Sequence, residues 1–375
     1  MKHLGIKSLR IYPVVPAGHT RPYLFVKLET DDRDIYGLGE ATLRVKTPAI
    51  IEALRLLEAR VRGMSVFNVE ELFYRYFYHD RWRNGVIMNT ALSALETAMY
   101  DAAARSLGVP VYNLLGGRLR DRVALYVHGW NRIPENVAAG FRAFKTDPIP
   151  FRTGKNLGPR RSEVPDGGVD AALQALQAAR EAAGPHVQLL VECHARFNYD
   201  EALEFIRGAE RFKPGFVEEP VQPDDWNGFK KLSRKSNLPL AGGERLFTRY
   251  GFRRVLEEGL LSIAQPDFTH CGGLMEAKKL SAMADAFYVR VAPHNSSGPI
   301  ATVASAHVDA TLSNFYMQEY IQQNTFEELF DEHPRIEDGA LLLDDSRPGL
   351  GLVPKWDKLE ALSAAGGEPP DAEDW

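Results

Sequence analysis

The chain has 375 residues, of which 45% are hydrophobic and 25% are charged, and its formal net charge is −5 at pH 7. This composition is typical of a globular protein, and the slight acidity excludes the basic surface by which proteins bind nucleic acid. No apolar run approaches the ~18 residues of a membrane span, and the first residues lack the pattern of a signal peptide. The two cysteines, Cys193 and Cys271, have no paired spacing, so the sequence predicts a cytoplasmic protein without disulfides. The charge and the lack of a long apolar run predict no nucleic-acid and no membrane partner.

Residues 1–121 are predicted to form an α+β domain. Alternating apolar residues indicate strands in roughly the first 45 positions. Helical spacing of apolar residues follows over 48–64 and 68–107. We assign Gly37 and Gly39 to a turn, because no phosphate-binding pattern follows them.

Over residues 122–349 the pattern becomes strand then helix, repeated eight times. Eight such units predict an α/β fold closed as a (β/α)8 TIM barrel, and apolar strand runs suit a parallel sheet that is buried on both faces. Residues 148–168 form a long polar segment after the second strand, which predicts a lid or a substrate-binding loop. The final segment, 350–375, is expected to pack back on the first domain.

Three glutamates stand 26 residues apart, each at the end of a short apolar run: Glu192, Glu218 and Glu244. That interval is about one strand–helix unit, so the three carboxylates are expected at one rim of the barrel, where TIM-barrel active sites lie. Hard oxygen ligands of this kind suit one Mg2+ ion, which Mn2+ could replace. Of the neighbours Glu218 and Glu219, the spacing and the strand alternation favour Glu218.

The ends of the other strands carry further polar residues at the same rim: Lys145, His194, Asp267, His294 and Glu319. Strands three and seven of an eight-stranded barrel lie opposite each other, so His194 and His294 are expected to flank a bound substrate. Asp267 lies on the strand beside His294 and could orient it as a general base. Such a site suits removal of a proton next to a carboxylate, with Lys145 and the metal stabilising the developing charge and His194 assisting the loss of a hydroxyl.

Several of these residues have a structural alternative. Lys145 could form an ordinary salt bridge, and Glu319 could be structural. Asp147 could contact substrate or begin the loop before Pro148, and Trp130 could line the pocket or pack within the barrel. We interpret His270 as a buried structural histidine, because Asp267 already ends that strand.

Stretches along almost the whole chain resemble the enolase superfamily, mandelate racemase subgroup. Within it the chain is most similar to sugar-acid dehydratases of the archaeal gluconate/galactonate type. The stretches that carry the resemblance are GLGEA, VHGWN, AFKTDP, VECHARFN, GFVEEPV, QPDFTHCGG and PHNSSG.

The resemblance implies an enolase-like modified barrel with an N-terminal α+β capping domain. It implies that Glu192, Glu218 and Glu244 bind magnesium, that His294 and Asp267 are the base pair, that His194 is the acid, and that Lys145 and Glu319 lie around the substrate carboxylate. Two positions depart from the subgroup. Glu192 stands where most members have Asp, and Asp147 stands where its racemases have a second lysine base, which favours dehydration over racemisation.

We therefore predict a hydro-lyase that converts an aldonate, gluconate or galactonate, to the 2-keto-3-deoxy acid, by anti elimination. Alternatives are another sugar acid (xylonate, arabinonate or mannonate), a sugar-acid epimerase or racemase, and a non-catalytic sugar-acid-binding protein. Groups that read the distal hydroxyls are expected from residues 19–23, from 44–47 and from the 148–168 loop, with Arg44, Lys46 and Arg152 as candidates. Homo-oligomers are common in this family, so one is expected.

Overall fold

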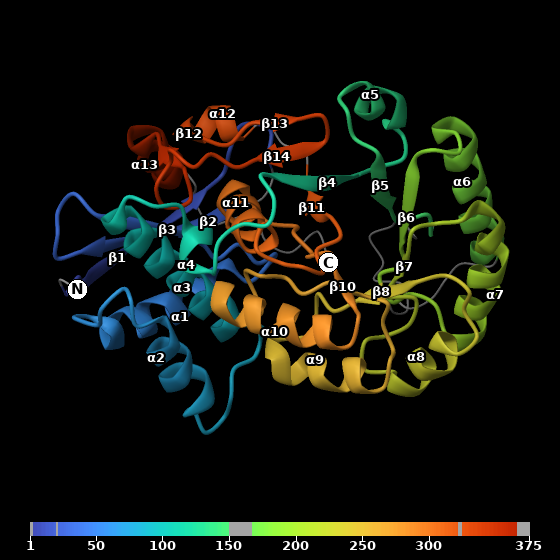
Figure 1. The fold of residues 1–375 in the computed structure, drawn as a ribbon, viewed down its shortest axis with the longest axis horizontal. Coiled ribbons are helices and arrows are strands. Elements are labelled where there is room, and N and C mark those ends of the chain that lie inside the picture. Colours follow the sequence, from blue (N-terminus) through green and yellow to red (C-terminus); the bar gives the residue numbers. More distant parts are fainter. Residues whose placement is uncertain (1–2, 20–21, 150–166, 322–324, 366–375) are drawn as a thin grey trace.

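The structure is a computed structural model that describes these parts of the chain: residues 3–19, 22–149, 167–321 and 325–365. It consists of two lobes, a first lobe of early strands and helices and a barrel of parallel strands surrounded by helices (Figure 1). Most of the predicted 148–168 loop, including Arg152, lies outside the described residues. No helix in the described ranges is both long enough and apolar enough to cross a membrane.

The first lobe is built on an antiparallel sheet with the strand order β1 (Ile6–Val14), β2 (Tyr23–Thr30) and β3 (Tyr36–Glu40). It also contains α1 (Thr47–Val61), α2 (Val69–Phe73), the π-helical turn η1 (Tyr74–Tyr78), α3 (Val86–Leu107) and α4 (Val111–Leu114). The central α3 is buried along most of its length, which suits its many alanines and other apolar residues.

The assignment of Gly37 and Gly39 to a turn is wrong, because both lie within β3 against α3. A Cβ atom on Gly37 would lie 1.8 Å from the carbonyl oxygen of Ala98, and one on Gly39 would lie 2.0 Å from that of Ala94. Glycine is therefore needed for the close approach of helix and strand.

The predicted helix over 68–107 is interrupted between Tyr78 and Val86. In that segment the Asp80 carboxylate accepts a hydrogen bond from the backbone of Trp82, and the Asn84 side chain donates one to the carbonyl of Tyr76. Such local side-chain bonds offer the backbone an alternative to the helix.

The barrel has the eight parallel strands that the sequence predicts: β4 (Arg122–His128), β5 (Ala143–Thr146), β6 (Gln188–Glu192), β7 (Val217–Glu218), β8 (Leu240–Gly242), β9 (Ile263–Ala264), β10 (Arg290–Val291) and β11 (Gln318–Tyr320). Neighbouring strands from β4 to β10 pair in order, and β11 pairs with β4. A bridge between Val291 and Phe315 brings the chain before β11 beside β10, which closes the ring.

Helices follow the strands on the outside: α5 (Ile133–Ala138), α6 (Gly168–Ala183), α7 (Tyr199–Ala209) with the short η2 (Glu210–Phe212), α8 (Trp226–Ser233), α9 (Thr248–Glu257), α10 (Leu274–Ala286) and α11 (Pro299–Asp309). After the barrel the chain forms α12 (Phe326–Leu329), β12 (Phe330–Glu332), β13 (Ile336–Glu337), β14 (Ala340–Leu342), β15 (Val353–Pro354) and α13 (Trp356–Ala365). In this last helix Trp356 packs against Tyr12 and Tyr36 of the first lobe, with ring centroids 5.9 and 5.4 Å apart.

Two buried carboxylates of the first lobe bind the N-termini of barrel helices. Glu40 accepts hydrogen bonds from the backbone of Gly298 and Ala301 at the start of α11, at 2.6 and 2.8 Å. Glu96 accepts bonds from two backbone amides at the start of α10, at 2.7 and 3.0 Å. Because helix N-termini carry unpaired amides and positive partial charge, these contacts fix the first lobe to the helices that follow β9 and β10.

Candidate active site at the barrel mouth

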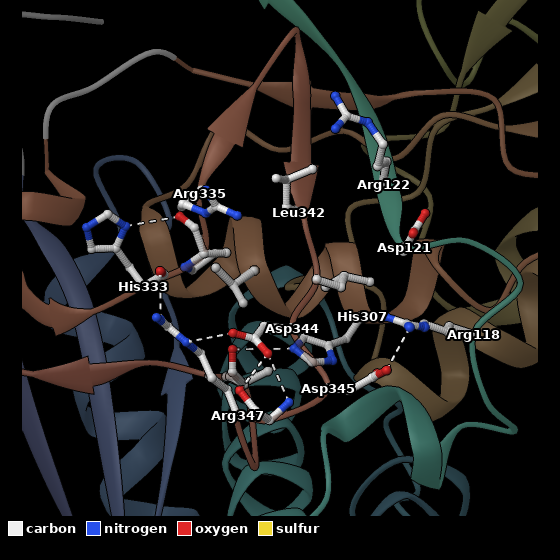
Figure 2. Close-up of a pocket in the computed structure, with 16 residues that line it drawn as sticks. Arg118, Asp121, Arg122, His307, His333, Arg335, Leu342, Asp344, Asp345 and Arg347 are labelled. Carbon is white, nitrogen blue, oxygen red and sulfur yellow. Dashed lines mark hydrogen bonds and ion pairs between the residues drawn. The ribbon is translucent and has the colours of Figure 1, made fainter.

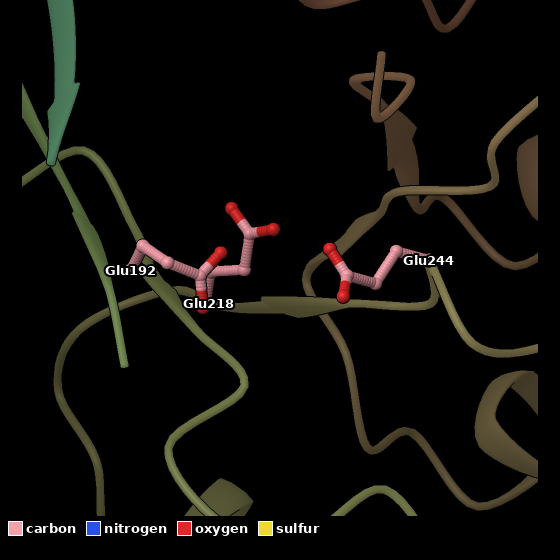
Figure 3. Close-up of side chains that lie close together, drawn as sticks. All are labelled: Glu192, Glu218 and Glu244. Atoms are coloured by element: carbon pink, nitrogen blue, oxygen red, sulfur yellow. The ribbon is translucent and has the colours of Figure 1, made fainter. Parts of the chain in front are cut away.

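The three glutamates at 26-residue spacing meet at the carboxyl ends of the barrel strands. Glu192 ends β6, Glu218 ends β7 beside it in register, and Glu244 follows β8 by two residues. One carboxylate oxygen of each lies within 4.8 Å of those of the other two, and Figure 3 shows the three side chains converging. The neighbouring Glu219 instead pairs with Arg245.

The Glu218 carboxylate provides the test of whether this cluster fits a metal. Its Oε2 accepts hydrogen bonds from Lys145 at 2.9 Å and from Gln265 at 2.7 Å, whereas its Oε1 is buried and has no hydrogen-bond partner among the described residues. An unsatisfied buried oxygen is costly. A divalent cation among three carboxylates would satisfy it, and an all-oxygen ligand set suits a hard cation.

Lys145, on β5, lies beside the cluster with 2% of its side chain exposed. Its ammonium is 2.9 Å from Glu218, 2.7 Å from Glu319 and 3.6 Å from Glu192. Although burial lowers it, the carboxylates of Glu218 and Glu319 hold the pKa of Lys145 well above its usual range. Lys145 is therefore a fixed positive charge among carboxylates.

The pKa values of Glu192 and Glu218 are shifted in opposite directions. Burial, reinforced by the charge of Glu218, raises the pKa of Glu192 well above its usual range. Burial also acts to raise the pKa of Glu218, but the ammonium of Lys145 lowers it overall. A cation bound at the cluster would favour the ionised form of both carboxylates.

His294 follows β10 and points its two ring nitrogens in different directions. Nδ1 lies 2.7 Å from the buried Asp267 carboxylate, while Nε2 lies 3.1 Å from Glu244 and 4.0 Å from Glu319. Burial lowers the pKa of His294, but the charges of Glu244, Glu319 and Asp267 outweigh it and raise this pKa to about 10. A cation bound to Glu244 would neutralise the largest of these raising effects and leave Nε2 able to accept a proton.

His194 stands two residues beyond Glu192, with φ of 46° and its backbone amide 2.5 Å from the Glu192 carboxylate. Its Nδ1 lies 2.6 Å from Asp147, and about half of its side chain is exposed, 51%. Burial is the main cause that lowers the pKa of His194 below its usual value. A non-glycine residue with positive φ is strained, and such strain is concentrated at functional sites.

Asp147 lies behind His194. Oδ2 contacts both His194 and the guanidinium of Arg196, and Oδ1 accepts a hydrogen bond from the backbone of Ile149 at 2.9 Å. Both carboxylate oxygens of Asp147 are therefore occupied by protein groups.

Glu319, on β11, is fully buried and joins several of these residues. Its Oε1 contacts Lys145 at 2.7 Å and also His128, and its Oε2 accepts a hydrogen bond from the backbone of Asn295 at 2.9 Å. Burial raises the pKa of Glu319, but the charge of Lys145 and the nearby histidines hold it well below its usual range.

The indole N–H of Trp130 donates to the carbonyl of Phe144 at 3.2 Å, and the ring packs against the core with partial exposure.

Two residues at this mouth were missed by the sequence analysis. His128 ends β4, and the rule that found the other strand-end residues would have found it, since it closes the apolar run VALYVH. Gln265 directly follows β9, two residues before Asp267, but its amide carries no charge that would mark it as a candidate. His270 is buried against Thr90 at 2.9 Å, in keeping with its structural interpretation.

A cavity of about 640 Å³ lies at the opposite end of the barrel, where β4 begins (Figure 2). Its arginines are paired locally: Arg118 with Asp345 at 2.7 Å, and Arg347 with Asp344 at 3.3 Å. It contains neither the convergent carboxylates nor the paired histidines of the mouth, so the mouth is the candidate active site.

The fold and this site define a member of a known enzyme family. Residues 8–116 match the mandelate racemase/muconate lactonizing enzyme N-terminal domain, and residues 131–358 match the enolase C-terminal domain-like family. The chain therefore belongs to the mandelate racemase/muconate lactonizing enzyme family of the enolase superfamily, and the predicted family and fold class are confirmed.

Individual relatives and a solved structure are similar to this chain over nearly its whole length. The chain is 34% identical to a D-gluconate/D-galactonate dehydratase of Picrophilus torridus, over 95% of this chain and 94% of that one. It is 33% identical to a D-galactonate dehydratase of Variovorax paradoxus, over 98% and 96%. An enolase from Pantoea ananatis with bound D-gluconate and Mg has a similar structure, with a TM-score of 0.86, 27% identity, and coverage of 98% and 96%. The prediction of an enzyme of the hydro-lyase class is confirmed by these relatives.

Proposed function

We propose that this protein catalyses the Mg2+-dependent dehydration of an aldonate, with gluconate and galactonate as the first candidates, to the 2-keto-3-deoxy acid. The observation that carries the proposal is the pair of histidine–carboxylate contacts, His294–Asp267 and His194–Asp147, on strands β10 and β6 on opposite sides of one carboxylate cluster. Relatives named for gluconate and galactonate dehydration support the substrate class.

In this proposal Glu192, Glu218 and Glu244 hold the cation. A bound Mg2+ ion would supply Lewis-acid stabilisation of the negative charge on the substrate carboxylate. Mn2+ is expected to replace it, since both ions accept oxygen ligands.

The histidines move the protons. His294 Nε2 removes the proton from C2, while its Nδ1–H is held by Asp267, which stabilises the imidazolium. His194 donates a proton to the hydroxyl on C3, which leaves as water as the C2–C3 double bond forms, and the resulting enol becomes the 2-keto-3-deoxy acid. Because the two histidines belong to opposite strands, we expect anti elimination.

The remaining predicted site residues support these steps. Lys145 and Glu319 lie beside the cluster and the base, which suits roles near the substrate carboxylate. The contacts of Asp147 favour a role in orienting His194 over direct binding of substrate. Trp130 is proposed as a wall of the pocket whose polar end is fixed to β5.

The test is a screen of purified protein with Mg2+ against gluconate, galactonate, xylonate, arabinonate and mannonate, in which the 2-keto-3-deoxy acid is detected with semicarbazide. We expect turnover of gluconate or galactonate that is abolished by EDTA and by His294→Ala. Exchange of deuterium into C2 without keto acid would indicate an epimerase instead. Binding without exchange or turnover would indicate a sugar-acid-binding protein, and either result would overturn the dehydratase proposal.

A further inference from the structure

The loop after β9 contains a buried histidine that faces the proposed base pair. His270 lies three residues beyond Asp267, and its backbone amide donates to the Asp267 carbonyl at 3.0 Å. The His270 side chain is buried, and its Nε2 lies 3.6 Å from Oδ2 of Asp267. The same Oδ2 lies 2.7 Å from Nδ1 of His294. One carboxylate oxygen of Asp267 therefore faces two imidazoles, of which the proposed reaction uses only His294.

The other ring nitrogen of His270 contacts the first lobe. Nδ1 lies 2.9 Å from Oγ1 of the buried Thr90 on α3. Two further residues of α3, at steps of three, hold the same loop: Ser93 Oγ accepts a hydrogen bond from the amide of Gly272 at 3.0 Å, and Glu96 accepts those at the start of α10. Residues three apart lie on one face of a helix. One face of α3 therefore holds this loop at three points, and one of these points is the His270 ring.

The Asp267 carboxylate is an ionised acceptor in this arrangement. Its Oδ1 accepts hydrogen bonds from the amide and the hydroxyl of Thr269, at 2.8 and 2.6 Å. Burial acts to raise the pKa of Asp267, but His270 and His294 lower it overall. An ionised carboxylate only accepts, so a ring nitrogen that faces Oδ2 is favourable when it carries a proton.

The hydroxyl of Thr90 makes that tautomer of His270 possible. Thr90 Oγ1 also lies 2.7 Å from the carbonyl of Val86, but this carbonyl is the acceptor of the helical bond within α3, so the hydroxyl proton is available to His270 Nδ1. Burial lowers the pKa of His270, so the ring is neutral at pH 7 and has a single N–H. With Nδ1 accepting from Thr90, this N–H is on Nε2. The opposite tautomer would turn a lone pair toward the charged Asp267.

At 3.6 Å the contact between His270 and Asp267 is longer than a hydrogen bond, so it acts through the direction of the Nε2–H dipole and by occupying the space beside the carboxylate. We propose that His270 is a positioning residue for the base: fixed by Thr90 of the first lobe, it holds the Asp267 carboxylate against Nδ1 of His294. The first lobe thereby helps to direct Nε2 of His294 toward the substrate. This inference rests on the proposed function, since it presumes that His294 is the base.

Two substitutions of His270 separate the role of its N–H from the filling of space. His270→Phe keeps the size of the ring but removes both nitrogens, whereas His270→Gln retains an N–H near the position of Nε2. We expect His270→Phe to lower kcat for the best aldonate of the panel roughly tenfold, with KM within about twofold of the parent, because the base is present but poorly directed. His270→Gln should retain kcat within about threefold of the parent. The folded fraction of each variant is measured by urea unfolding, and kcat is expressed per folded enzyme.

A double-mutant cycle tests the connection to the first lobe. Thr90→Val removes the hydroxyl with little change of shape and should lower kcat roughly threefold. In the His270→Phe background it should have no further effect, since the connection is already broken. The matched control is Ser93→Ala, which removes a bond from the same face of α3 to the backbone of the same loop. Because Ser93 does not contact the imidazole, this substitution should leave kcat per folded enzyme within about twofold in either background.

Three outcomes would overturn the inference and leave the dehydratase proposal standing. They are a kcat for His270→Phe within about twofold of the parent, equal losses in His270→Phe and His270→Gln, and additive effects of Thr90→Val and His270→Phe. A parent protein that neither forms the keto acid nor exchanges the C2 hydrogen of any acid in the panel is a different result. In that case the proposed function fails first, and the inference fails with it.

Discussion

The two ends of the barrel hold similar kinds of charged residue in opposite arrangements. At the mouth one ammonium, Lys145, is surrounded by the carboxylates of Glu192, Glu218 and Glu319, and a buried oxygen of Glu218 has no partner among the described residues. At the other end Arg118 and Arg347 of the cavity pair locally with Asp345 and Asp344 of the loop after β14. Charges that are balanced locally contribute to structure, whereas an unbalanced, buried group indicates a ligand that the protein is built to receive.

The largest expected effect comes from the base. His294→Asn should lower kcat by about 10³-fold or more, because it removes the group that accepts the C2 proton. Steady-state kinetics with Mg2+ would measure this. The control is His333→Ala at the distant cavity, which should leave kcat within about twofold. A similar loss in both variants would contradict the division between the two ends.

Substitution of the proposed acid, His194, is expected to have the next largest effect, and it should separate dehydration from proton exchange at C2. His194→Asn should lower dehydration by about 10²-fold, while exchange of the C2 hydrogen with deuterated water continues, because His294 is intact. Asp147→Asn should show a weaker form of the same behaviour, since it removes the charge that orients His194. NMR of the recovered substrate measures the exchange, and its loss in parallel with dehydration would exclude separate roles for the two histidines.

Metal affinity should respond to the groups around Glu218. Gln265→Leu removes a donor to Oε2 and should weaken Mg2+ binding about tenfold, as loss of a residue that orients a metal ligand commonly does. Calorimetric titration of the protein with Mg2+ would measure the affinity independently of activity. The control is Gln318→Leu. Gln318 is buried on β11 next to Glu319, but its side chain donates to the carbonyl of Thr302 in α11 and not to a metal ligand, so this substitution should leave the affinity unchanged.

The smallest expected effect is a pH dependence of stability at the far end. His307 is buried and stacks on the ring of Tyr112, whose backbone amide donates a hydrogen bond to His307 Nδ1 at 3.2 Å. Burial lowers the pKa of His307 to about 4. Because the folded-state pKa lies below the unfolded value, stability is present at neutral pH and is lost as pH falls through the range from about 6.5 to 4. From pH 7.5 to pH 6 the free energy of unfolding should fall by about 1 kcal/mol. Urea unfolding should show a smaller fall in His307→Gln, and an equal fall would assign the effect to other groups.

The sequence predicted the barrel well, because most strands lie in short apolar runs that a polar residue ends or closely follows, and this local pattern needs no tertiary information. It chose Glu218 over Glu219 for the same reason. It overextended the helix after residue 68, because the turn-forming Asp80 and Asn84 were outweighed by the apolar pattern around them.

The contacts behind the strand ends could not be predicted in the same way. The pairing of Asp147 with His194 depends on the left-handed backbone at His194 and Ala195 and on the position of Arg196. The role of Gly37 in β3 depends on how closely α3 approaches, which spacing alone does not reveal. Residues joined through tertiary packing leave little local pattern in the sequence.

The carboxylates of Glu40 and Glu96 limit how this protein could be divided. They occupy the amides at the starts of α11 and α10, the helices that follow the strands of His294 and Asp267. A fragment containing the barrel alone would leave those amides without their acceptors, next to the two residues of the proposed base pair. The two lobes are therefore expected to be inherited, expressed and engineered only as a unit, with neither lobe exchangeable as an independent module.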